Sequence, residues 1–244
     1  MKIDQNLPVH NKFNGRASKR NAYHQAGHVV SIYLRNRSKN LPSVHFQIAI
    51  KPVGQQTGIS VRFARIPTKL VIKLEEGRLI TDLPYSYEAA TRRLTLAEKQ
   101  LCQDAFEADI VNLLVGSLAE AKYVAHRDDE VFNANLVYLG ALKFYGGGMD
   151  LELINEYMAC IMPNQPKERE LRLAELFLEA YGFINDPDNW VVIKKLAETF
   201  VNSPQDIVAC EELIHLIESA NPINIKFPVT TNIFATSIVS AYCR

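Results

Sequence analysis

The heptapeptide AYHQAGH runs from Ala22 to His28, within a stretch over 19–36 that has the apolar pattern of a helix. Its apolar residues recur about every 3.6 positions and so fall on one face. The apolar face consists of Ala22, Tyr23, Ala26, Val29, Val30 and Tyr33. The two histidines, His24 and His28, fall roughly opposite that face, together with Ser31. We therefore expect a helix whose histidines line a cleft beside the core.

The spacing of His24 and His28 places two imidazoles on one helix face, close enough to share a metal ion. The alternative is two polar residues on a partly wet face. Gly27 favours a site, because a glycine inside a helix costs about 1 kcal/mol relative to alanine and so needs a reason. Close approach of another segment is such a reason. That segment can belong to a functional site, or Gly27 can serve only the packing of two helices.

The composition limits the classes of function. The chain has 244 residues, enough for one large domain or two small ones, and its 48% hydrophobic and 22% charged residues are typical of a soluble globular protein. Basic and acidic residues number 27 each, so the net charge gives no reason to expect nucleic acid or an anionic membrane as partner. The sequence has no signal-peptide core, no apolar run of the ~20 residues that span a bilayer, and no C-x-x-C pair among its four cysteines. We expect a cytoplasmic protein with reduced cysteines and no membrane span.

The sequence pattern predicts a mainly α protein with a small β-region. Residues 1–18 are polar and are expected to form a flexible N-terminal arm, 19–220 to form the domain, and 221–244 to form a C-terminal tail packed on it. Alternating apolar residues near 43–75 predict a small sheet or hairpin set. Its expected strands are 44–50, 59–63 and 70–74.

From residue 95 onward the pattern is helical almost throughout. Thr95 and Glu98 fit a capping box, which predicts a helix from there to about His126. Residues 76–93 have the pattern of an irregular segment between the sheet and this helix. Glycine and proline positions divide the rest into expected helices at about 130–144, 149–162, 166–182, 188–201 and 204–219.

The heptapeptide differs in one letter from A-Y-H-E-A-G-H, which contains the H-E-x-x-H signature of zinc peptidases. In this it resembles the FtsH-type membrane AAA proteases, the ATP-dependent zinc metallopeptidases. Two later stretches are similar to the same family in the same order. Residues 109–120, DIVNLLVGSLAE, resemble its helix R-I-x-x-L-L-G-G-R-A-A-E, and residues 147–152, GGMDLE, resemble its G-A-S-N-D-L-E. The resemblance covers the peptidase domain only, roughly residues 20–220.

The resemblance implies a helical, zincin-like metallopeptidase fold with a Zn²⁺ site made of His24, His28 and Asp150. Asp150 also has an independent argument, because three glycines let the backbone bend towards the histidine helix and leave this aspartate at the next helix start. Alternatively, Asp150 only caps its own helix. Glu120 matches a family glutamate near the metal, so it is a candidate to hold a ligand imidazole, or else a solvated or ion-paired face residue. Asp109 lies eleven residues earlier, on nearly the same helix face.

Gln25 stands where the family has its general-base glutamate. A carboxylate there takes the proton of a zinc-bound water, and an amide cannot. Because positioned general bases contribute about 10²–10⁴-fold, we expect hydrolysis to be weak or lost while zinc binding survives. Two alternatives stay open. One is an active metallopeptidase whose base is another carboxylate, Glu120 or Glu152, and the other is a metal-free helical protein-interaction module.

Two further departures concern the rest of the family's machinery. The sequence has no G-x-x-x-x-G-K-[ST] P-loop, so the family's ATPase motor is not encoded in it. The spacing from His28 to Asp150 is longer than in the family, with the excess placed in 62–95 and 127–145. We expect a stand-alone zinc domain. Its expected partners are a peptide or polypeptide ligand, another protein, and copies of the chain in a small homo-oligomer.

Overall fold

Helix α3 (Leu96–Arg127) is the longest element of the structure, and its start is fixed by the predicted capping box. Thr95 Oγ1 accepts a hydrogen bond from the Glu98 backbone N–H (3.3 Å), and Glu98 Oε2 accepts one from the Thr95 N–H (2.7 Å). These bonds satisfy donors that have no partner inside the helix. The structure is a computed structural model and describes residues 17–52, 70–135 and 137–220.

Helix α1 (Lys19–Ser38) packs directly on α3, and the two backbones approach closely at Gly27. A Cβ built at Gly27 would lie 2.7 Å from the Ala119 Cβ and 2.9 Å from the Val115 carbonyl oxygen. The predicted close approach is confirmed, and the approaching segment is α3. The face of α1 that carries the histidines and Ser31 is covered as well, because all three are buried.

The sheet confirms two of the expected strands and adds one that the sequence pattern did not predict. Strands β1 (Phe46–Pro52) and β2 (Leu70–Glu76) pair antiparallel, and the order is β2-β1-β3. The third strand, β3 (Ile207–Val208), pairs with the other edge of β1. The helix predicted over 204–219 is therefore wrong in its first part, and α7 (Cys210–Ala220) begins only after this strand. The expected strand 59–63 lies outside the described residues.

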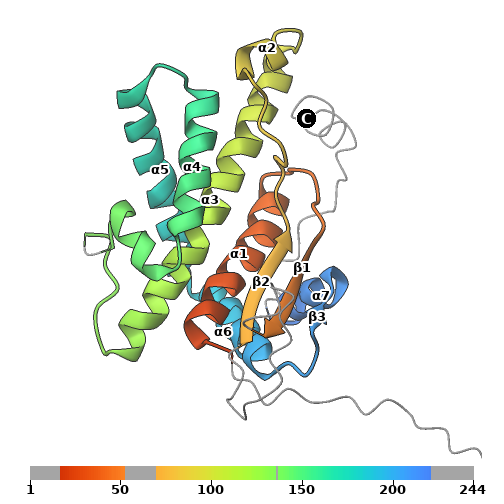
Figure 1. The fold of residues 1–244 in the computed structure, drawn as a ribbon, viewed down its shortest axis with the longest axis vertical. Helices are drawn as coiled ribbons and strands as arrows, with labels where there is room; N and C mark the ends of the chain where they lie inside the picture. Colours follow the sequence, from red (N-terminus) through yellow and green to blue (C-terminus); the bar gives the residue numbers. More distant parts are fainter. Residues whose placement is uncertain (1–16, 53–69, 136, 221–244) are drawn as a thin grey trace, which may run out of the picture.

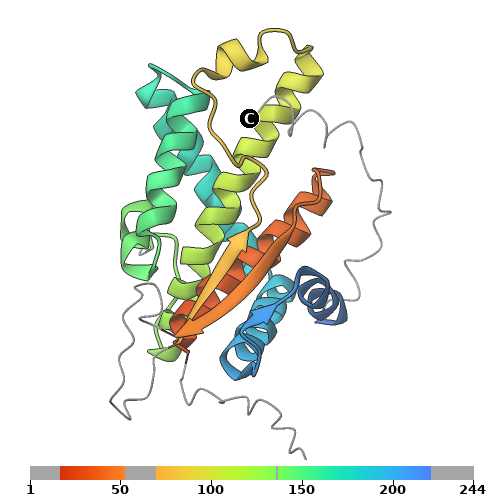
Figure 2. The same ribbon diagram turned by 45° about the vertical axis from the view of Figure 1, so that its right-hand side comes forward.

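The remaining long helices pack on α3 or on α1. Figure 1 shows α4 and α5 on one side of α3 and α1 with the sheet on the other, and Figure 2 shows the same division after rotation. Three of them confirm predicted helices: α4 (Gly148–Ile161), α5 (Pro166–Asn185) and α6 (Pro187–Asn202). Together the described residues form a mainly α fold with a small antiparallel sheet, as the sequence predicts, and share one hydrophobic core.

Two predicted segments differ from the structure. The helix expected over 130–144 is wrong: residues 130–135 and 137–138 are not helical, and they precede a short 3₁₀-helix, η1 (Leu139–Tyr145). The Asn133 side chain accepts from the Asn135 backbone N–H (2.8 Å), a local turn that competes with helix formation. The segment 76–93, expected to be irregular, contains the short helix α2 (Tyr87–Thr91).

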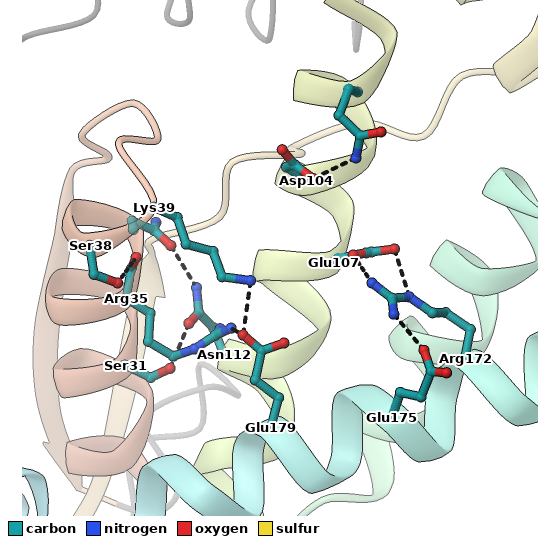
Figure 3. Close-up of polar contacts among 12 residues, drawn as sticks. Ser31, Arg35, Ser38, Lys39, Asp104, Glu107, Asn112, Arg172, Glu175 and Glu179 are labelled. Carbon is teal, nitrogen blue, oxygen red and sulfur yellow. Dashed lines mark hydrogen bonds and ion pairs between the residues drawn. The ribbon is translucent and has the colours of Figure 1, made fainter. Parts of the chain in front are cut away.

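Buried acidic groups on α3 connect it to the segment after β2 and to α5. The Asp109 carboxylate accepts from the backbone N–H groups of Leu79 (3.0 Å) and Ile80 (2.8 Å). Burial raises the pKa of Asp109 to about 7, although the two backbone hydrogen bonds oppose this. Farther from the sheet, the buried Glu107 receives two hydrogen bonds from Arg172 of α5 (Figure 3).

The predicted N-terminal arm lies outside the described residues except at 17–18, and the predicted C-terminal tail lies outside them entirely. Among the helices of the described ranges, none combines the length and apolar character needed to cross a bilayer.

Candidate metal centre

Three side chains that can hold a metal ion converge between α1 and α4. Asp150 Oδ2 lies 3.1 Å from His24 Nε2 and 3.6 Å from His28 Nε2. One potential ligand atom from each residue lies within 4.8 Å of the others, and the two imidazole rings meet edge to face with centroids 4.7 Å apart. The structure thus brings together the three residues that the sequence assigned to a metal site.

The glycines before α4 bring Asp150 to the histidines. Gly146 has a φ of +77°, a left-handed conformation that L side chains rarely adopt. A Cβ there would also lie 2.8 Å from His24 Nδ1, so a larger residue would collide with the His24 imidazole. Gly147 occupies the N-cap position of α4, and Asp150 lies three residues further on with its carboxylate at the imidazoles. This placement differs from the alternative in which Asp150 is itself the cap of its helix.

Backbone carbonyl groups hold the far side of both imidazoles. His24 Nδ1 lies 3.1 Å from the Tyr145 carbonyl oxygen, and His28 Nδ1 lies 2.8 Å from the Asn112 carbonyl oxygen. Because a carbonyl oxygen only accepts, each Nδ1 must carry the hydrogen and donate it. In the neutral imidazole the lone pair is then on Nε2, the atom that faces Asp150. Metal-binding histidines typically have their other ring nitrogen held in this way.

Glu120 lies beside His24, on the side away from Asp150. Its Oε2 is 3.4 Å from His24 Nδ1, and its Oε1 accepts from Arg20 Nε at 2.7 Å. Arg20 also donates to the carbonyl oxygen of Phe144 (2.7 Å). Glu120 is therefore both next to the imidazole and ion-paired, so the two alternatives for this residue describe one arrangement. Arg20 was not predicted, although it lies one helical turn before His24.

The charges of this cluster favour a cation. Burial opposes the charge on His24, but its hydrogen bonds to Asp150 and Glu120 prevail and raise the pKa of His24 to about 9. Burial would raise the pKa of Asp150, yet the charges and hydrogen bonds of His28 and His24 hold it well below its usual range. The pKa of Glu120 is likewise lowered despite its burial, by hydrogen bonds to His24 and Arg20. Two anionic carboxylates thus flank one imidazole.

Gln25 has a hydrogen-bond partner of its own. Its Oε1 accepts from the Leu74 backbone N–H at 2.8 Å, and one turn earlier Asn21 Oδ1 accepts from the Ile72 N–H at 2.8 Å. Strand β2 is at the edge of the sheet, and these two amides cover N–H groups that β1 does not use. The side chain at the position that the family resemblance assigns to the general base therefore attaches the sheet to α1.

A cleft of about 600 Å³ gives access to the three candidate ligands. Its walls come from α1, β2 and the start of α4, and its lining includes Gln25 and Asn112 as well as the ligands. Glu152, two residues after Asp150, lines the same cleft and is exposed. Of the two carboxylates considered as a relocated base, only Glu152 is thus placed on the open side of the site.

Comparisons with known proteins add no family assignment. No protein-family model, curated protein or solved structure gives a significant match to this chain. The similarity to the FtsH-type peptidases therefore rests on the three sequence stretches and stays a prediction.

Proposed function

We propose that this chain is a zinc-binding, metallopeptidase-like domain related to the FtsH-type proteases, in which hydrolysis is weak or lost. The observation that carries the proposal is the orientation of the two histidines. Their Nδ1 atoms are held by backbone carbonyls, so both Nε2 atoms, the sites of the lone pairs in the neutral rings, converge with one carboxylate oxygen on the same point. A metal cation bound at this point would take the place of the proton that His24 Nε2 otherwise shares with Asp150 Oδ2.

The donor set fits zinc better than a hard cation. Imidazole nitrogens suit Zn²⁺, whereas Ca²⁺ and Mg²⁺ take oxygen ligands almost entirely. Two histidines and one carboxylate leave one tetrahedral position open, which is the pattern of catalytic rather than structural zinc sites. A zinc bound here would acidify the water in that position. The cleft gives this position access to a ligand, and a peptide or polypeptide is the ligand class that the family resemblance implies.

Gln25 supports the loss of hydrolysis. A carboxamide can hydrogen-bond a water but cannot take its proton, and the Gln25 oxygen already accepts from Leu74 of β2. We therefore expect a rate lower by about 10²–10⁴-fold than that of a site with a positioned base. Zinc affinity does not depend on this residue, because it is not among the converging ligands.

Glu152 supports a second candidate function, an active metallopeptidase with a relocated base. Its carboxylate lines the cleft next to Asp150, and its exposure leaves it free to move towards a bound water. Glu120 is a poorer candidate, because it lies on the Nδ1 side of His24 and binds Arg20. The metal-free interaction module is the third candidate and is separated from the other two by metal content.

Zinc titration of the purified, metal-stripped protein tests the site. We expect one Zn²⁺ per chain, with binding greatly weakened in His28→Ala and Asp150→Asn. His45→Ala is the matched control, because His45 is exposed and pairs with Glu76 away from the cluster. Absence of zinc binding, or equal affinity in all four proteins, would remove the metal function and leave the interaction module.

Casein hydrolysis by the zinc-loaded protein separates the two remaining candidates. If the base is lost, we expect little activity, and Gln25→Glu should raise it because a carboxylate can take the proton of a bound water. The variant should keep its contact with β2, since a carboxylate oxygen can also accept from the Leu74 N–H. A relocated base predicts activity that is abolished by Glu152→Gln, with the same substitution at Glu156, one turn along α4, as control. No gain in zinc-loaded Gln25→Glu would show that the cleft itself has diverged from a peptidase.

A further inference from the structure

We infer that Asn112 is a positioning residue that sets the orientation of His28 as a metal ligand. The inference rests on the proposed metal site and adds to it a polar network that fixes how α1 sits on α3. Asn112 contributes its backbone to His28 and its side chain to two other residues of α1.

The backbone contact depends on a gap in the surface of α3. A Cβ built at Gly116, one turn after Asn112, would overlap the His28 imidazole. The ring therefore lies in the space that Gly116 leaves, and from there its Nδ1 donates to the Asn112 carbonyl oxygen (2.8 Å). With Nδ1 as the donor, Nε2 is directed at Asp150.

The side chain of Asn112 makes the contacts that hold the two helices in this register. Ser31 Oγ donates to Asn112 Oδ1 at 2.6 Å, and Asn112 Nδ2 donates to Asn36 Oδ1 at 3.2 Å. Figure 3 shows Asn112 on α3 reaching across to Ser31 on α1. Ser31 lies one turn after His28, and all these side chains are buried. One residue of α3 thus contacts α1 at three successive places.

Hydrogen bonds add direction to an interface that glycine already makes close. The close approach at Gly27 and the space for His28 at Gly116 both disfavour a slide of the helices by one residue, about 1.5 Å. Hydrogen bonds of 2.6–3.2 Å between buried groups would not survive such a slide, and unpaired buried polar groups are costly. The network therefore acts together with the two glycine contacts to favour the register in which His28 meets both the Asn112 carbonyl and Asp150.

Asn112→Ala tests the inference, with Ser31→Ala as a milder variant that removes a single hydroxyl. Ser38→Ala is the matched control on the same helix, because among the residues that the structure describes the Ser38 hydroxyl bonds only within α1, to the Arg35 carbonyl. Zinc affinity is measured by competition with a chromophoric chelator, at a temperature where circular dichroism shows every protein folded. We expect Asn112→Ala to bind zinc about 10–100-fold more weakly, Ser31→Ala less so, and Ser38→Ala as the wild type does.

A second readout does not need bound metal. The ¹⁵N chemical shifts of the His28 ring report which nitrogen carries the hydrogen, and we expect the Nδ1–H form to lose population in Asn112→Ala and Ser31→Ala. Wild-type affinity and wild-type ring shifts in both variants would overturn the inference. If the wild type binds no zinc but the variants change the ring shifts, the proposed function fails while the positioning of His28 by Asn112 stands. If Asn112→Ala does not fold, Ser31→Ala decides by the same two measurements.

Discussion

Replacing Gly27 by alanine probes the contact on which the histidine pair depends. The added Cβ would lie 2.7 Å from the Ala119 Cβ and 2.9 Å from the Val115 carbonyl oxygen. Carbon atoms in ordinary contact are about 3.5–4.0 Å apart. Neither neighbour is the end of a flexible side chain, so α1 and α3 must separate or shift as bodies.

Two effects of opposite sign determine how much Gly27→Ala changes the free energy of unfolding. Alanine favours a helix over glycine by about 1 kcal/mol, whereas overpacking an interior costs about 1–3 kcal/mol. Gly182 on α5 isolates the first effect, because a Cβ there meets nothing within 4 Å. Comparing the two variants cancels helix propensity. We expect Gly27→Ala to be less stable than Gly182→Ala by about 1–3 kcal/mol in free energy of unfolding.

Urea unfolding followed by far-UV circular dichroism measures this difference. For a chain of this size it corresponds to a melting temperature lower by about 2–12 °C in Gly27→Ala than in Gly182→Ala. Zinc affinity should fall only in Gly27→Ala, because α1 carries His24 and His28. Equal stabilisation by the two alanines would refute the close approach of α1 and α3, and with it the frame that holds the site.

Three further variants test the polar contacts of α3. Asp109→Asn should destabilise the fold by about 1–3 kcal/mol, because an amide N–H₂ would face a buried backbone N–H. The pKa of Asp109 is raised from 3.8 to about 7 on folding, so the stabilisation that this residue gives is lost as the pH rises through 7. In urea unfolding, the advantage of the wild type over Asp109→Asn should therefore shrink as the pH rises from 4 through 7. Thr95→Ala should cost about 1 kcal/mol by removing the cap of α3, and an unchanged urea midpoint would contradict the capping box. Arg172→Ala should cost about 1–3 kcal/mol by leaving the buried Glu107 without its ion pair; the double variant with Glu107→Gln should recover much of that loss, and no recovery would show that Arg172 acts through packing instead.

The elements that the sequence predicts well are those whose signal is local. The helix around His24 and the helix that begins after Thr95 each have a periodic apolar face, a cap, or both. Strand β3 has no such signal, because two residues cannot show a period and pair only where β1 offers a free edge. The 3₁₀-helix η1 has the composition of an ordinary helix, and its glycines end it after two turns.

The candidate site likewise combines residues that the sequence can predict with contacts that it cannot. His24 and His28 could be predicted from their spacing on one helix face, and Asp150 from the family resemblance together with the glycines that precede it. The groups that hold the imidazoles are the carbonyl oxygens of Tyr145 and Asn112, and every residue has a carbonyl, so no residue type marks them in a sequence. The role of Gln25 as an acceptor for β2 was equally hidden, because the partner is a backbone N–H.

The arrangement of the three candidate ligands also has a consequence for folding. His24 and Asp150 are 126 positions apart in the chain, so an ion held between them would act as a cross-link that closes most of the domain into one loop. Ligands that bind only the folded chain stabilise it by about 2.7 kcal/mol at one hundred times their dissociation constant. The metal would then link α1 to α4 reversibly, and the free energy of unfolding would increase with the concentration of free metal.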